Sequence, residues 1–150
     1  MKIASLGIGA LAVVALCGTA EAKRNAYAAG VDVQTTSGTG CLDSSSSAFT
    51  GVLQYDGLSG KTAALRVPLP SVGLVSTQIL TVTAGLGTAH PSGSFTWKAV
   101  GPSGTLWNLS GTFQVTVTTV DANSYVFAMS ETYGGCTENS YISATNLKPK

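Results

Sequence analysis

Hydrophobic and polar residues alternate along almost the whole chain beyond its first 22 residues, as in the run Phe113 to Val117. Side chains of a β-strand point alternately to its two faces, so this period of two predicts half-buried strands. Segments rich in glycine, proline, asparagine and aspartate separate the alternating runs, as expected of turns. We predict eight strands, near residues 29–36, 48–56, 61–67, 77–84, 94–100, 105–120, 124–133 and 140–147.

The short spacing of these strands predicts how they connect. Strands joined by brief turns form an antiparallel meander, which either closes into a barrel or folds over as a sandwich. We therefore predict an all-β fold without deciding between the two forms. Pro68 should end the third strand, because proline has no N–H for the ladder. A bulge at Ser110-Gly111 would interrupt the long sixth strand.

The same alternation predicts which side chains fill the interior. The inward set is bulky, so we expect it to fill the space between the strands rather than leave a hollow. Tyr55, Tyr133 and Tyr141 lie near turns or on mixed faces, and we expect them to be exposed. The predicted inward residues are Phe49, Leu53, Leu65, Leu80, Trp97, Trp107, Phe113 and Phe127.

The first 22 residues have the pattern of a signal peptide. Lys2 supplies a positive charge, residues 3–17 form a short apolar stretch, and residues 20–22 (AEA) offer a small-x-small cleavage pattern. The pattern predicts removal of residues 1–22 and one secreted or periplasmic domain of residues 23–150, with a leader of bacterial type. A membrane span or lipid attachment at Cys17 is the less favoured alternative, because the apolar stretch is short and Leu16 is bulky.

The charge and the cysteine content limit the classes of partner and the compartment that we expect. Charged residues make up 10% of the chain and the net charge is +1, against about 25% charged residues in typical soluble domains. No basic stripe exists, so we expect no nucleic acid as a partner, and the domain has no apolar run long enough for a membrane span. Cys41 and Cys136 remain once the leader is removed, which predicts one disulfide in an oxidising compartment.

Residues suited to catalysis or metal binding are few. The single histidine, His90, lies in a predicted exposed loop and cannot build a usual zinc site, so we expect no metal and no cofactor. Glu131 shares a face with apolar residues, and we expect that face to open to water near the strand end. If Glu131 is buried instead, Arg66 or Lys98 would be its partner. The candidate ligand-binding residues are Glu131, Tyr133, Tyr55, Tyr141 and Arg66.

These observations favour a secreted, non-enzymatic β-domain that acts as a binding module at or outside the cell surface. Its partner would be a protein, a glycan or a small apolar ligand. One alternative is a self-associating subunit of a surface fibre or matrix, because the run 114–120 (QVTVTTV) is suited to edge-to-edge pairing. A second alternative is an inhibitor of a secreted hydrolase.

Overall fold

The computed structural model describes residues 25–43, 45–69 and 73–148. The predicted signal peptide lies outside these residues. The described chain forms eight β-strands, close to the predicted positions but mostly longer. They are β1 (Ala26–Gly38), β2 (Ala48–Gln54), β3 (Thr62–Leu69), β4 (Leu74–Ala84), β5 (Ser92–Gly101), β6 (Gly104–Asp121), β7 (Ser124–Tyr133) and β8 (Cys136–Asn146).

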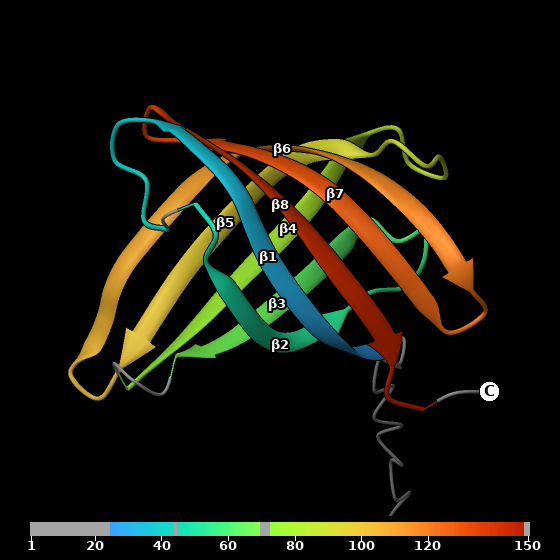
Figure 1. The fold of residues 1–150 in the computed structure, drawn as a ribbon, viewed down its shortest axis with the longest axis horizontal. Coiled ribbons are helices and arrows are strands. Elements are labelled where there is room, and N and C mark those ends of the chain that lie inside the picture. Colours follow the sequence, from blue (N-terminus) through green and yellow to red (C-terminus); the bar gives the residue numbers. More distant parts are fainter. Residues whose placement is uncertain (1–24, 44, 70–72, 149–150) are drawn as a thin grey trace, which may run out of the picture.

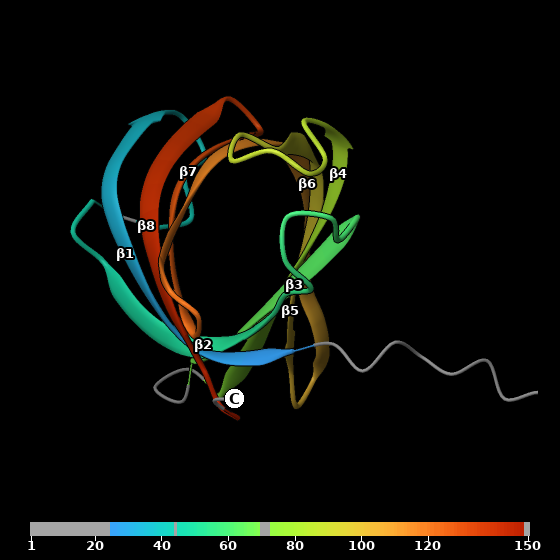
Figure 2. The ribbon, with the colours of Figure 1, turned by 90° about the vertical axis from the view of Figure 1, so that its right-hand side faces the viewer.

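The strands form a closed barrel in which each strand pairs with its neighbours in the sequence (Figure 1). All of these pairs are antiparallel, and β1 closes the ring by pairing with β8 from Tyr27–Asn146 to Gly38–Cys136. Figure 2 shows the strands surrounding a common interior. The predicted all-β meander is confirmed, and the structure selects the barrel over the sandwich.

Two local predictions about strand ends and bulges are wrong. Strand β3 continues through Pro68, which lies opposite Val75 of β4. The pairing of β3 with β2 already ends at Arg66, so Pro68 has a strand on one side only, where a missing N–H is tolerated.

The register of β6 also passes Gly111 without a shift, since the irregularities lie elsewhere in its two ladders. Gly111 has a different role from the predicted bulge. A β-carbon there would lie 2.8 Å from the Phe95 ring and 2.2 Å from the Thr132 carbonyl oxygen. The glycine therefore lets a core ring pack directly against the backbone of β6.

One disulfide joins the two extremities of the domain. Cys41 in the loop between β1 and β2 is bonded to Cys136 at the start of β8, with 5.1 Å between their Cα atoms. The predicted pairing is confirmed. A cross-link over 95 residues removes about 4–5 kcal/mol of unfolded-state entropy in the chain-entropy model.

The barrel interior has two chemically different ends. At the end near the start of β1, which we call the tyrosine end, Tyr27, Tyr55, Tyr125 and Phe127 pack edge to face with ring centroids 5.1–6.4 Å apart. At the opposite end, next to Cys136 and called the disulfide end, polar side chains are buried. These polar residues are Ser76, Gln78, Glu131, Glu138 and Ser140.

Candidate functional site: a polar pocket inside the barrel

The disulfide end of the interior contains a cavity of about 150 Å³, which we call the interior pocket. Phe49, Trp97 and Trp107 contribute aromatic surface to its lining, and the five buried polar residues of this end line it as well. The expectation of a filled interior therefore does not hold at this end. A concave, mostly apolar site with a few convergent polar groups is the usual form of a small-molecule site.

Glu131 is the most deeply buried carboxyl group of the pocket. It lies on β7, is 3% exposed, and accepts a hydrogen bond of 2.5 Å from Gln78 Nε2 to its Oε1. Strands β4 and β7 are separated by β5 and β6, so this bond crosses the interior. The expectation that Glu131 reaches water is wrong, because the face it shares with Phe127 and Met129 is enclosed up to the end of β7.

The predicted cationic partners of Glu131 are also wrong. Arg66 and Lys98 are exposed on β3 and β5, because both occupy outward positions in the alternation of their strands. Among the described residues no cationic side chain pairs with Glu131, and its partner is the neutral amide of Gln78. A buried carboxyl group without a cation is a costly arrangement, of the kind that proteins retain at functional sites.

Glu138 lies directly opposite Glu131 on β8 and is 4% exposed. Tyr133 Oη donates a hydrogen bond of 3.2 Å to Glu138 Oε2 and accepts one of 3.2 Å from the Leu42 backbone N–H. Sequence reasoning missed Glu138 because it began the last strand at Ser140. The alternation of β8, extended back by two residues from Ser140, would have placed Glu138 on the inner face.

Burial and neighbouring carboxyl groups hold protons on this carboxyl pair. Burial raises the pKa of Glu131 to about 8, and the neighbouring Glu138 adds to the rise, while the Gln78 hydrogen bond opposes it. Burial also raises the pKa of Glu138 to about 7; Asp43 adds to this rise and the Tyr133 hydrogen bond opposes it. Near neutral pH the pocket can therefore both donate and accept hydrogen bonds.

The two tryptophans form an aromatic corner of the pocket. Their rings meet edge to face with centroids 6.3 Å apart, and Trp97 also contacts the Tyr133 ring at 6.0 Å. Trp97 Nε1 donates to Ser76 Oγ. The buried Nε1 of Trp107 has no hydrogen-bond partner within the described part of the chain, which leaves this pocket-lining residue with an unsatisfied donor.

The loop between β1 and β2 forms part of the pocket wall. Leu42 and Asp43 line the pocket, and two links hold them there: the disulfide of the adjacent Cys41 and the hydrogen bond from Leu42 N–H to Tyr133. Burial raises the pKa of Asp43. The disulfide thus shapes the pocket as well as closing the chain.

The predicted site residues do not gather in one place. Glu131 and Tyr133 belong to the interior pocket region. The prediction that Tyr133 is exposed is wrong, because its side chain is buried. Tyr55 is buried at the tyrosine end, which also contradicts its predicted exposure. Tyr141 is 51% exposed, as predicted, on the outer face of β8, and Arg66 lies on the outer face of β3.

The surroundings of His90 bear on whether the chain has a second site. His90 is exposed, as predicted, and its Nδ1 lies 3.3 Å from Thr116 Oγ1. The described ranges contain no cluster of three or more His, Cys, Asp or Glu side chains that could hold a metal ion. They also contain no helix that is long and apolar enough to cross a membrane.

Comparison with known proteins adds no relative: no protein-family model, curated protein or solved structure matches the chain.

Proposed function

We propose that this chain is a secreted binding module that takes a small ligand into the interior pocket. The observation that carries the proposal is a cavity of about 150 Å³ at the disulfide end, in a barrel of a size that side chains usually fill. Buried polar groups converge on this cavity from β4, β7 and β8. Buried polar groups lower the stability of the folded state unless a hydrogen-bond partner satisfies them.

The pocket favours a ligand with an apolar body and one hydrogen-bonding group. A cavity of roughly 150 Å³ accepts a molecule of the size of benzene. Aromatic walls from Trp97 and Trp107 suit a flat or branched hydrocarbon body. Glu131 and Glu138 then offer partners for a hydroxyl or amino group.

The alternatives to a binding module gain less support. Two facing carboxyl groups are also the residue set of glycoside hydrolases, but a pocket of about 150 Å³ inside a barrel is small for a sugar chain. Each strand has two neighbours in the closed barrel. Few strand edges are therefore left unpaired for edge-to-edge assembly into a fibre. No feature of the loops that the structure describes favours a hydrolase inhibitor.

Tryptophan fluorescence can test the proposal directly. The chain has two tryptophans, and both line the pocket, so a bound molecule must change their emission. We expect saturable changes with benzyl alcohol and benzylamine, and weaker binding of benzoate, because its charge would lose its water with no cationic side chain among the described lining residues.

A matched pair of variants controls the titration. Ser140→Leu fills the pocket and should abolish the change, whereas Ser143→Leu places the same side chain on the outer face of β8 and should leave it intact. Far-UV circular dichroism confirms that both variants fold. Saturable binding that Ser140→Leu leaves unaltered, or no response to any of these probes, would refute the proposal.

A further inference from the structure

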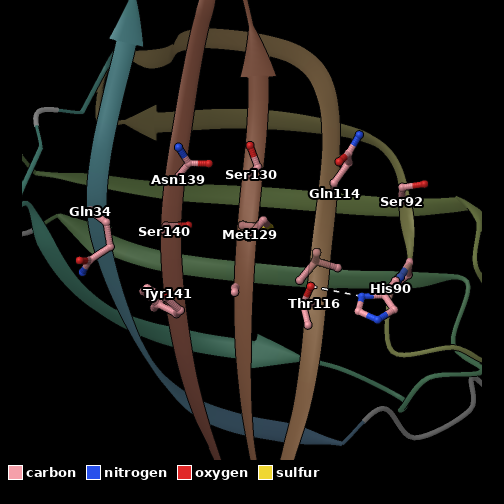
Figure 3. A pocket seen from close by; sticks show the side chains of 13 residues that line it. Gln34, His90, Ser92, Gln114, Thr116, Met129, Ser130, Asn139, Ser140 and Tyr141 are labelled. Atoms are coloured by element: carbon pink, nitrogen blue, oxygen red, sulfur yellow. Dashed lines mark hydrogen bonds between the residues drawn. The ribbon is translucent and has the colours of Figure 1, made fainter.

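The outer face of the barrel is hollowed over four strands, β1, β8, β7 and β6 (Figure 3). This outer hollow has a volume of about 720 Å³. Ala128 and Ser130 point outward from β7, yet they are only partly exposed, and longer side chains stand on either side of them on β6 and β8. A concavity of this volume lies in the range of binding sites, about 300–1,000 Å³.

The side chains that line the outer hollow form two parallel rows across the strands. Cross-strand pairing aligns Gln114, Ser130 and Asn139 in one row, which we call the amide row. The neighbouring row is Thr116, Ala128 and Tyr141, and His90 extends it through its contact with Thr116 Oγ1. The two rows are two residues apart on each strand, which is about 7 Å.

The amide row offers donors and acceptors that the protein leaves available. Gln114 and Ser130 make no side-chain hydrogen bond with any other described residue. Asn139 Nδ2 donates to Thr35 Oγ1 at 2.9 Å, which holds the amide in place and leaves Oδ1 as an acceptor. An amide donates and accepts at neighbouring atoms, as a pair of adjacent sugar hydroxyls requires.

The second row supplies ring surface beside these amides. Tyr141 is 51% exposed and stands next to the small side chain of Ala128, so a flat molecule can lie on its ring without a clash. Aromatic rings bury the apolar faces of such molecules effectively. His90 lies on the far side of the same row (Figure 3), so the hollow is long enough to engage more than one ring.

The lining carries no aspartate, glutamate, lysine or arginine among the described residues. A phosphate backbone would need basic side chains, and a protein partner would need an apolar interface core. We propose that the outer hollow binds a neutral polysaccharide, with sugar rings stacked on Tyr141 and their hydroxyls bound by the amide row. This site lies on the opposite face of the sheet from the interior pocket, and Met129 and Ser140 belong to both linings.

Affinity electrophoresis in native gels can test this site with defined polymers. The probes are a mixed-linkage β-glucan, a galactomannan and soluble starch, with the acidic polymer alginate for comparison. At least one neutral polymer should retard the protein, and alginate should not. Tyr141→Ala and Gln114→Ala should each weaken binding and raise the dissociation constant about tenfold.

Two further variants separate stacking from general surface effects. Tyr141→Phe keeps the ring and should retain binding, and Ile79→Ala changes an exposed side chain of β4 outside the hollow and should bind normally. Lack of retardation by every neutral polymer, stronger retardation by alginate, or equal binding by Tyr141→Ala, Gln114→Ala and Ile79→Ala would each overturn the proposal. Benzyl alcohol titration of Tyr141→Ala should be unchanged, so failure here is distinct from failure at the interior pocket.

Discussion

The two ends of the barrel interior are lined by the same set of strands, yet different side chains occupy them. At the tyrosine end the rings of Tyr27, Tyr55, Tyr125 and Phe127 interlock, and a cavity of only about 60 Å³ remains nearby. At the disulfide end serines and carboxyl groups stand in the equivalent inward positions, around a cavity of about 150 Å³. The comparison indicates that one end supplies packing energy and the other gives up stability for a pocket.

The largest effect should come from removing the disulfide that holds the pocket wall. The double variant Cys41→Ser/Cys136→Ser should lose about 4–5 kcal/mol of unfolding free energy and should also lose benzyl alcohol binding. Urea denaturation and tryptophan fluorescence measure the two effects. A variant that binds the alcohol as well as the natural sequence does would show that the loop is not part of the pocket.

A truncation at the tyrosine end should affect stability without affecting the pocket. Phe127 is buried against Tyr55 with ring centroids 5.1 Å apart, so Phe127→Ala should cost about 4 kcal/mol of unfolding free energy. The interior pocket should keep its affinity wherever the variant remains folded. A loss below about 1 kcal/mol would mean that this end is not the main packed core.

The carboxyl pair should make stability fall as the pH rises. Burial raises the pKa of Glu131 to about 8, so between the ordinary carboxyl pKa of about 4.3 and about 8 the folded state binds more protons than the unfolded state. The contribution of Glu131 to the unfolding free energy is fully present below that window and is lost through it, by an amount on the order of 5 kcal/mol.

Thermal unfolding between pH 5 and pH 8 measures this slope. Glu131→Gln should remove the part of the slope nearest pH 8, because a neutral amide replaces the carboxyl group with the higher pKa, while Glu138 should keep the slope below about pH 7. Asp32→Asn, which changes an exposed carboxyl group, should leave the slope unaltered. A flat profile for the natural sequence would show that Glu131 ionises freely.

The smallest expected change in unfolding free energy comes from removing a single tyrosine hydroxyl group at each end of the interior. Tyr133 Oη joins Glu138 to the Leu42 N–H, so Tyr133→Phe should cost about 1 kcal/mol of unfolding free energy. The Oη of Tyr55 has no partner among the described residues, so Tyr55→Phe should be neutral or slightly stabilising. Equal losses in both variants, measured by urea denaturation, would contradict the assignment.

The alternation of residues was enough to predict the strands and their antiparallel order, because each strand pairs with a neighbour in sequence. It could not decide between barrel and sandwich. That choice depends on the pairing of Tyr27 with Asn146 and its neighbours, which joins the two ends of the domain and has no local signal.

The same limit explains the errors at the candidate site. Alternation placed Glu131 on the correct face, but its burial depends on the full length of β8 and on a loop brought over by the disulfide. The outer hollow is lined by residues from several strands that pair across the sheet, so the positions of Gln114 and Tyr141 in the sequence do not reveal that they share a surface.

The disulfide that holds the loop at Cys41 has a consequence for when the wall of the interior pocket is fixed in place. The bond to Cys136 forms in oxidising compartments and is rare in the cytosol. A newly made, still reduced chain would therefore lack the covalent link beside Leu42 and Asp43, two residues of the pocket wall. If the interior pocket binds a ligand as we propose, its affinity should be lower before this bond forms than after it.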